Sequence, residues 1–432
     1  VVPDPYLPGH GDLRYTVEHY DLALDYRLTT NRLDAVATLR VVAREATDTL
    51  RLDLSGLHVS RVRVGGAKPK KCTHKDRVLT LKLAHALAVG EATTVEVAYA
   101  GKPGPVPGVH GPAGWEELTD GVLVASQPYG APSFYPCNDR ADDKASYRIA
   151  VTTDPEYAVV ATGRPTGTST RAGRTTWVFE EAAPTASYLV SIVIGRLAAE
   201  PLPGSGGRVT LHRPRGRAVP PASPLLRLPA MLDALEGWFG PYPLPDFRAV
   251  VVDEPLEIPL EAQGMASFGT NHLVDDWDTE RLVVHELAHQ WFGNKVTSGL
   301  LRDIWLHEGF ACYTEWLWSE ARGLLTADER AARHHKALPM QQQTTPLADP
   351  GMPAMFDDWV YKRGALTLHA LRVALGDAAF FAVCRSWVAE HSVASTTTFV
   401  DHVARVTGTD QSALLATWLD AVKLPACPRL RA

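Results

Sequence analysis

The sequence has no long apolar run and no excess of basic charge. Its longest apolar stretches, at residues 188–194 and 249–252, are the length of strands and fall well short of the roughly 20 residues that a membrane-spanning helix needs. Lys and Arg number 43 against 49 Asp and Glu, a net charge of −6. A mildly acidic chain lacks the basic surface that non-specific nucleic-acid binding requires. The sequence therefore predicts neither a membrane span nor a nucleic-acid partner.

Cysteine is also scarce. Five cysteines, an odd number without any C-x-x-C pair, favour free thiols over a disulfide framework, and we expect Cys137 and Cys312 to be buried. The chain opens without a signal peptide, so we expect a cytoplasmic protein, although it starts at Val1 rather than Met and a removed leader stays open. We find no internal repeat or low-complexity tract, and Gly and Pro are near average, which excludes collagen-like and disordered chains.

The first 200 residues have the alternating apolar pattern of half-buried strands. The apolar positions that alternate are Tyr20, Leu22, Leu24, Tyr26 and Leu28, then Leu50, Leu52 and Leu54, then Leu79, Leu81 and Leu83, then Val95, Val97 and Tyr99, and finally Tyr147, Ile149 and Val151. Turn-rich stretches separate these runs. We predict an N-terminal all-β domain over residues 1–200, built as an antiparallel sheet or sandwich.

The pattern changes after Gly195. A segment rich in Pro and Gly at residues 200–224 predicts a connection to a second domain. Helical periodicity begins at 225–239, one strand is expected at 247–252, and most of the chain from residue 279 to about 423 is predicted to be helical. The length allows two or three domains at about 100–200 residues each, and because the pattern changes here we divide the chain into 1–200 and a mainly helical α+β domain over 201–432.

One helix carries a pattern of metal ligands, His285-Glu286-Leu287-Ala288-His289. Two histidines four residues apart lie one turn apart on the same helix face. Both imidazoles can therefore reach one metal ion while Glu286 projects beside them. Asp276–Thr279 offers residues that cap the start of this helix, and Gly293 stands where its C-terminus is expected.

A third ligand is needed, because catalytic zinc is held by three protein ligands and keeps an open position for water. Glu308 follows His289 after 18 residues, a distance that a helix end, a short loop and the start of a second helix can cover. Two neutral imidazoles and one carboxylate would leave a site of net charge +1, which lowers the pKa of bound water toward about 7.

These residues resemble the zinc aminopeptidases of the aminopeptidase N and leukotriene hydrolase family, a gluzincin family whose pattern is H-E-x-x-H, 18 residues and Glu. The resemblance covers H-E-L-A-H-Q-W-F-G-N at 285–294 and W-L-H-E-G-F-A at 305–311. Residues 134–139 with Lys144 resemble the family's F-P-C-x-D segment, and residues 188–195 the strand that closes its N-terminal domain. Residues 361–365 resemble Y-x-K-G-A, with Arg363 in place of Lys. The chain would be a short two-domain member, with a thermolysin-like catalytic domain and without the helical C-terminal domain.

The resemblance implies a role for each matching residue. One Zn²⁺ per chain would be held by His285, His289 and Glu308. Glu286 would be the general base for zinc-activated water, and would pass the proton to the leaving amine. Tyr361 would donate a hydrogen bond to the developing oxyanion.

An aminopeptidase must also recognise a free α-amine, which attracts carboxylates. The family uses the Glu of G-x-M-E-N, and the best match here is Glu261, whose neighbours Ile258, Leu260 and Ala262 depart from the motif. Glu254 and Glu257 are competitors for this role. A second family position, in a Q-x-E or Q-x-Q pair, is matched by Gln127. Tyr129 replaces the second acid or amide, which would weaken amine binding or alter the pocket for the first residue.

Some further side chains are expected to support the site, and others are expected to have no role in it. Asp303 and Glu315 are candidates to hold the zinc-bound histidines in place, and Glu315 shares a helix face with Glu308. His307 is not expected to be a ligand, because neighbouring helix residues diverge by about 100°. His334 and His335 are expected to form an exposed helix pair.

The predicted function is a zinc metallo-aminopeptidase that removes the N-terminal residue from peptides. Alternatives remain open. They are a zinc endopeptidase without a strict need for a free amine, an epoxide hydrolase on the same scaffold, and a non-enzymatic binding module with structural zinc. The last is disfavoured because structural zinc usually has four protein ligands. The sequence does not indicate the preferred first residue or the oligomeric state.

Overall fold

The structure is a computed structural model that describes residues 2–341 and 343–429. Its contacts divide the chain into two compact units. The first runs to Glu200 and also takes in Thr210–Ala218 and Asp246–Asn271. The second comprises Pro201–Val209, Val219–Pro245 and the chain from His272 onward. Two segments after residue 200 thus pack with the first unit, and the division into 1–200 and 201–432 stays a prediction.

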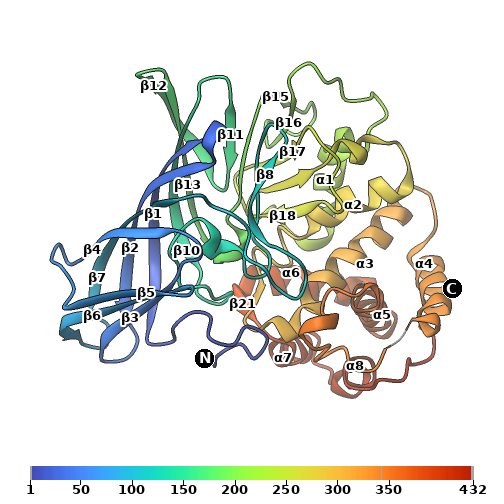
Figure 1. The fold of residues 1–432 in the computed structure, drawn as a ribbon. Helices are drawn as coiled ribbons and strands as arrows, with labels where there is room; N and C mark the ends of the chain where they lie inside the picture. Colours follow the sequence, from blue (N-terminus) through green and yellow to red (C-terminus); the bar gives the residue numbers. More distant parts are fainter. Residues whose placement is uncertain (1, 342, 430–432) are drawn as a thin grey trace. The chain divides into compact units, whose positions relative to one another are not determined.

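A seven-stranded sheet dominates the first unit (Figure 1). Its strands in spatial order are β12 (Arg164–Arg171), β13 (Arg174–Thr185), β10 (Ala145–Thr153), β1 (Tyr15–Arg27), β2 (Arg32–Ala43), β7 (Ala92–Gly101) and β4 (His58–Val64). The predicted alternation is present, since Tyr20, Leu22 and Leu24 of β1 are all buried. β1 pairs antiparallel with β2 but parallel with β10. Leu28 lies outside β1, in a short turn of 3-10 helix.

Three smaller sheets complete the first unit. The strands are β3 (Thr47–Asp53), β6 (Val78–Leu87) and β5 (Lys71–Lys75) in one sheet, and β11 (Ala158–Ala161), β14 (Ile192–Gly195), β9 (Gly121–Ala125) and β8 (Gly114–Leu118) in the next. A five-stranded sheet has β15 (Leu197–Pro201), β16 (Val209–Pro214), β17 (Phe247–Val251), β19 (Met265–Phe268) and β18 (Leu260–Ala262). The five strands of this last sheet lie within residues 197–268, and its residues Val250 and Met265 pack in one apolar cluster with Leu123 and Val193 of earlier strands. This packing explains why segments beyond residue 200 belong with the first unit.

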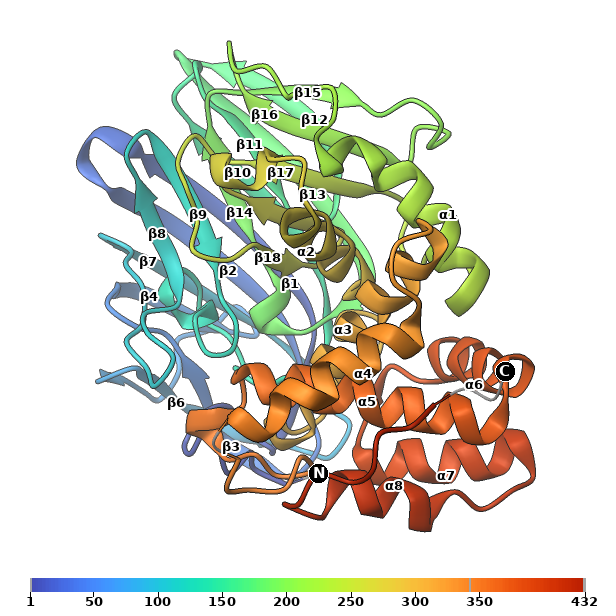
Figure 2. The ribbon, with the colours of Figure 1, turned by 90° about the vertical axis from the view of Figure 1, so that its right-hand side faces the viewer.

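The second unit is helical (Figure 2). Its helices are α1 (Leu228–Phe239), α2 (Trp277–Ala288), α3 (Trp305–Ala321), α4 (Ala327–Ala337), α5 (Asp358–Leu375), α6 (Asp377–Glu390), α7 (Thr396–Thr407) and α8 (Ser412–Leu419). A two-stranded sheet of β20 (Thr297–Ser298) and β21 (Val393–Ala394) joins them. The predicted fold class, a mainly β N-terminal part followed by a helical catalytic part, is confirmed.

The helices of the second unit pack around α3. Both α2 and α5 lie against α3, and α3 is buried along nearly its whole length, including Trp305, Trp316 and Trp318. At the crossing of α3 and α5, Gly309 and Gly364 meet with no side chain between them. A Cβ atom built on Gly364 would lie only 2.7 Å from the Cα of Gly309. The two glycines therefore let these helices approach backbone to backbone.

Arg363 ties α5 to the end of α8. Its guanidinium is fully buried and donates to the carbonyls of Trp418 and Val422, each at 2.8 Å, and to that of Ala421. The carbonyl of Trp418 is one that the end of α8 leaves without a partner within the helix, and the other two lie just beyond that end. A planar guanidinium has five donors in a fork, whereas a lysine ammonium is a compact charge, which explains why Arg suits this position.

All five cysteines are free thiols, and the expected burial of Cys137 and Cys312 is confirmed. Across the described residues, we find no helix with the length and apolar character needed to cross a bilayer.

Candidate metal centre

The helix α2 presents the two histidines on one face. Asp276 caps its start, accepting a hydrogen bond from the backbone N–H of Thr279 at 2.7 Å, as predicted. The helix ends at Ala288, earlier than the expected end at Gly293. His289 nevertheless keeps helical dihedrals, and its N–H donates to the carbonyl of His285 at 3.2 Å. The two imidazole rings therefore stay one turn apart, with centroids separated by 4.8 Å.

The first turn of α3 brings Glu308 to these histidines. Its Oε2 lies 3.3 Å from Nε2 of His285 and 3.5 Å from Nε2 of His289. All three side chains are buried. Between the two helices the chain passes through β20, whose pairing with β21 turns it back toward α3. The structure thus brings together the three residues that sequence reasoning selected as ligands.

The other nitrogen of each imidazole has an acceptor of its own. Nδ1 of His285 donates to Oε1 of Glu315 at 2.8 Å, and Nδ1 of His289 donates to the carbonyl of Phe292 at 3.1 Å. A carboxylate and a carbonyl can only accept hydrogen bonds, so each Nδ1 carries its proton. The lone pair of each Nε2 can then face a metal ion, which is the arrangement of metal-binding histidines.

The carboxylates of the cluster favour a positive charge at its centre. Burial alone would lower the pKa of His285, but its hydrogen bonds to Glu308 and Glu315 raise that pKa to about 9. Burial would raise the pKa of Glu308, yet the charges and hydrogen bonds of the two histidines hold it below its usual range. The pKa of Glu315 is likewise lowered, to about 2, because Lys362 and His285 outweigh its burial. Both carboxylates are ionised at neutral pH.

This donor set fits one zinc ion. The ligand atoms of His285, His289 and Glu308 all lie within 4.8 Å of one another. Two imidazoles and one carboxylate form a set used by catalytic zinc, which leaves a coordination position for water or substrate. Acceptors already orient both histidines, and the local charge favours a cation.

A second cluster in the same unit fits a metal less well. Glu390, His391 and His402 also place their ligand atoms close together. However, the guanidinium of Arg405 hydrogen-bonds Nδ1 of His402 at 3.0 Å and pairs with Glu390. A fixed positive charge thus already neutralises this cluster, so His285, His289 and Glu308 are the stronger candidates for a metal centre.

Glu286 and Tyr361 flank the cluster on different helices. Glu286 follows His285 on α2 and is buried, with 4% of its surface exposed. Tyr361 lies on α5, and its ring stacks near that of His285 with centroids 5.8 Å apart and planes 23° from parallel. Because Gly364 lies less than one turn beyond Tyr361, and Gly309 directly follows Glu308, the glycine crossing fixes Tyr361 relative to the ligands.

The candidate amine-binding residues belong to the first unit. Glu261 is half-buried on β18, where it pairs with Ala266 of β19. Gln127 is half-buried just after β9. The Tyr129 hydroxyl donates to the carbonyl of Gly111 at 2.6 Å and accepts from the N–H of His110 at 3.2 Å. The phenol that replaces the family's second acid or amide therefore holds a loop of its own unit.

The remaining predicted residues have separate roles. Glu315 holds His285, as described above. Asp303 accepts hydrogen bonds from the N–H and hydroxyl of Thr396 at the start of α7. His307 points its Nε2 at the backbone N–H of Ser298, 2.8 Å away, so this nitrogen is occupied away from the metal centre.

Sequence reasoning missed Arg281. Its guanidinium lies 3.6 Å from Oε2 of Glu315, the oxygen that does not bind His285. Arg281 stands four residues before His285, so the i, i+4 spacing places it on the ligand face of α2 and could have identified it.

Comparison with known proteins agrees with this site. The model for the peptidase family M1 domain matches residues 227–418, and that for the peptidase M1 N-terminal domain matches residues 16–189. A solved M1 zinc metallopeptidase from Deinococcus radiodurans is 31% identical, superposes with a TM-score of 0.89, and each chain covers 99% of the other. The chain therefore belongs to the peptidase M1 family.

Two further relatives bear on function. A variant of the Deinococcus radiodurans enzyme, solved with a Tyr-Ser-Ala substrate, matches with 31% identity, a TM-score of 0.89 and 99% coverage of both chains. Human endoplasmic reticulum aminopeptidase 1 is 25% identical over 88% of this chain and 44% of its own length. The chain thus spans about half the length of the curated relatives that it matches.

Proposed function

We propose that the protein is a zinc-dependent aminopeptidase that hydrolyses the N-terminal residue from peptides. The observation that carries the proposal is the buried set of His285, His289 and Glu308, with both imidazoles oriented through Nδ1 and Glu286 beside them. Membership of the M1 family supports it, as do the aminopeptidases among its relatives.

His285, His289 and Glu308 would hold the zinc ion. When bound, zinc supplies Lewis-acid activation of water and of the scissile carbonyl. Glu315 and the carbonyl of Phe292 would keep the two imidazoles in the binding tautomer. Arg281 would keep Glu315 in place through its second oxygen.

Glu286 would act as the general base. A buried carboxylate beside the ligands can take a proton from the attacking water and give it to the leaving amine. Tyr361 would donate its phenolic hydrogen to the carbonyl oxygen as that oxygen gains negative charge. Its position one turn of α5 from the glycine crossing would hold the donor ready before substrate binds.

Glu261 and Gln127 would recognise the free α-amine. Glu261 supplies the negative charge that an ammonium group requires, and Gln127 supplies a carbonyl acceptor. A free N-terminus would then be required for efficient binding. Peptides are accordingly the proposed partners of the protein.

One observation favours a second candidate, an endopeptidase that accepts blocked N-termini. The Tyr129 hydroxyl already bonds the backbone at Gly111, so that position offers no charged group to an amine. Amine recognition would then rest on Glu261 with less support than the family pattern provides.

A paired hydrolysis assay separates these functions. A fluorogenic peptide with a free N-terminus would be compared with its N-acetylated form, each with and without chelator. Cleavage of the free form alone, lost to chelator and restored by zinc, is expected for an aminopeptidase. Equal cleavage of both forms would establish the endopeptidase instead, and zinc-loaded protein that cleaves neither would contradict both.

The Glu286→Gln variant tests the assigned base. It should retain zinc, because the three ligands are untouched, while turnover falls by about 100- to 10,000-fold. Zinc content by elemental analysis and the kcat for the free peptide report the two effects separately. Activity near that of the natural protein would show that another group is the base.

A further inference from the structure

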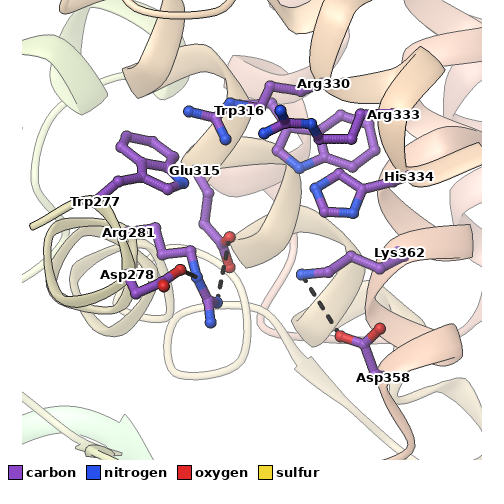
Figure 3. Close-up of a pocket in the computed structure, with 10 residues that line it drawn as sticks. All are labelled: Trp277, Asp278, Arg281, Glu315, Trp316, Arg330, Arg333, His334, Asp358 and Lys362. Atoms are coloured by element: carbon purple, nitrogen blue, oxygen red, sulfur yellow. Dashed lines mark hydrogen bonds and ion pairs between the residues drawn. The ribbon is translucent and has the colours of Figure 1, made fainter. Parts of the chain in front are cut away.

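A cavity of about 300 Å³ opens in the helical unit beside the metal centre (Figure 3). Side chains from α2, α3, α4 and α5 line it, and four of its lining residues are cations while three are carboxylates. The proposed function makes no use of this cavity, and its composition indicates what it would bind.

The charges of the cavity are only partly paired. Arg281 lies within ion-pair distance of Asp278 and Glu315, and Lys362 lies 3.7 Å from Asp358. Figure 3 draws dashed lines for these pairs and none to Arg330 or Arg333. Within the part of the chain that the structure describes, no carboxylate lies within 4 Å of either of these two guanidiniums.

Arg330 is held rigidly at the cavity wall. It is 93% buried, since only 7% of its surface is exposed. Its guanidinium stacks on Trp277 at 4.0 Å from the ring centroid, and its Nε donates to the hydroxyl of Ser319 at 2.9 Å. Burial and the nearby charge of Arg333 lower the pKa of Arg330, and they outweigh the carboxylates of Glu315 and Asp278, which raise it.

Trp316 adds a neutral donor to the same wall. Its side chain is 99% buried, and its indole N–H has no acceptor among residues 2–341 and 343–429. His334 stacks on Trp316 with ring centroids 5.2 Å apart, and the half-buried His335 hydrogen-bonds the carbonyl of Pro425 at 2.7 Å. The expected exposed histidine pair is therefore wrong. Burial, and next the charge of Lys362, lower the pKa of His334 to about 4, so the ring is neutral at pH 7.

The cavity adjoins the metal centre through shared side chains. Glu315 lines the cavity with one side and binds His285 with the other. Lys362, also in the cavity wall, directly follows Tyr361 on α5. The imidazole of His285 and the carboxylate of Glu315 thus stand between the metal centre and the cavity, so an anion in the cavity would come from a part of the peptide beyond the scissile bond.

We propose that this cavity binds a carboxylate of the substrate on the leaving-group side of the scissile bond, through Arg330, Arg333 and the indole N–H of Trp316. The inference rests on the proposed function and names its preferred substrates. Two guanidiniums without acid partners and a buried N–H without an acceptor together form an anion-binding set. Peptides whose second residue is acidic, or whose C-terminus lies at that residue, would supply the anion.

The charge of the cavity also decides which side of the bond it serves. The released N-terminal residue carries an ammonium group, which a wall with an excess of cations repels. The leaving group, in contrast, carries a carboxylate in every dipeptide and in every peptide with Asp or Glu at the second position. The cavity thus complements the leaving group rather than the first residue.

Two pairs of substrates with a common first residue test the proposal. Xaa-Glu-NH₂ and Xaa-Gln-NH₂ differ only in side-chain charge, whereas Xaa-Ala and Xaa-Ala-NH₂ differ only in the C-terminal carboxylate. We expect kcat/KM to be about tenfold higher for the charged member of at least one pair, the size of one charge-assisted hydrogen bond. The pair that shows the preference identifies the source of the anion.

Variants connect the preference to the cavity. Arg333 is exposed, so Arg333→Gln should fold normally and lower the charged-to-neutral ratio about fivefold or more, while Arg333→Lys should keep most of it. Arg385→Gln removes the same charge from an exposed position on α6, outside the cavity, and should leave the ratio unchanged. Trp316→Phe should lower the ratio without changing the charge of the protein.

The outcomes distinguish this inference from the proposed function. Equal kcat/KM within both pairs, in a protein that turns over neutral peptides, would overturn the carboxylate site and leave the aminopeptidase intact. A preference that survives Arg333→Gln and Trp316→Phe would also overturn it, because the anion would then bind elsewhere. Zinc-loaded protein without turnover of any substrate would overturn both.

Discussion

Gly309 and Gly364 form the closest approach between the helix that carries Glu308 and the helix that carries Tyr361. A Cβ on Gly309 would lie 2.9 Å from the Cα of Gly364, and a Cβ on Gly364 only 2.7 Å from the Cα of Gly309. Neither position has room for a methyl group unless backbone moves. The distance between the proposed ligand Glu308 and the proposed oxyanion donor Tyr361 therefore depends on the absence of a side chain at both glycines.

Gly364→Ala is expected to damage both stability and catalysis. The added methyl group would push α5 from α3, at a cost of about 1–3 kcal/mol typical of overpacking, and would displace Tyr361. Thermal unfolding and kcat/KM measure the two effects. The matched control is Gly237→Ala in α1, where a Cβ would meet nothing within 4 Å, and which should stabilise the helix slightly. Normal stability and activity of Gly364→Ala would disprove the tight crossing.

Glu315→Gln should weaken zinc binding without removing a ligand. The amide can still accept from His285, but it no longer neutralises the developing positive charge of the imidazole, and Arg281 loses one of its two carboxylate partners. Loss of such a partner typically costs about 10- to 100-fold in metal affinity. Competition with a chromogenic chelator measures the zinc Kd. Asp233→Asn, which alters an exposed acid on α1, serves as control, and an unchanged Kd for Glu315→Gln would contradict the assigned role.

Tyr361→Phe removes one hydroxyl and keeps the ring that stacks near His285. If the hydroxyl donates only to the charged transition state, kcat should fall by about 100- to 1,000-fold while KM changes little. Zinc content should stay the same. A variant in which KM rises and kcat holds would instead make Tyr361 a contact for the ground-state substrate.

His212 predicts how stability depends on pH. It lies on β16 and is mostly buried, and burial followed by the charge of Arg248 lowers its pKa to about 4. The unfolded chain therefore takes up a proton near pH 6.5, whereas the folded protein takes it up only near pH 4. Stability is complete above pH 6.5 and is lost as the pH falls through this window, by on the order of 2 kcal/mol after allowance for partial exposure.

His212→Gln should flatten this dependence, because the variant has no proton to take up at this position. Urea unfolding between pH 4.5 and pH 7.5 measures it. His85→Gln, which alters an exposed histidine on β6, should retain the slope of the natural protein. An equal slope for His212→Gln would show that other groups cause the loss of stability.

Local spacing made the proximity of the candidate metal-centre residues predictable. His285 and His289 are related by one helical turn, and Glu315 follows Glu308 by two turns, so their shared faces follow from helix geometry alone. The burial of Tyr20, Leu22 and Leu24 in β1 was equally predictable, because it follows from their alternation in the local sequence.

Contacts between distant segments could not be predicted from the sequence. The sheet that holds β16 and β17 joins the first unit because Val250 and Met265 pack against Leu123 and Val193, which lie more than 50 residues earlier in the chain. His334 looked exposed because its helix is polar, and only the neighbouring α3 provides the Trp316 ring on which it stacks. The end of α2 before Gly293 similarly depends on the turn that carries the Phe292 carbonyl to His289.

The buried guanidinium of Arg363 links residues 418–422 to the helix that carries Tyr361. Arg363 donates hydrogen bonds to the carbonyls of Trp418 and Val422, and it stands next to Gly364 and two residues after Tyr361. A protease cut or an inserted affinity tag close to residue 422 would break these hydrogen bonds and shift the position of Tyr361, the proposed oxyanion donor. Where a purification tag is placed should therefore influence measured turnover, even though the tag never enters the metal centre.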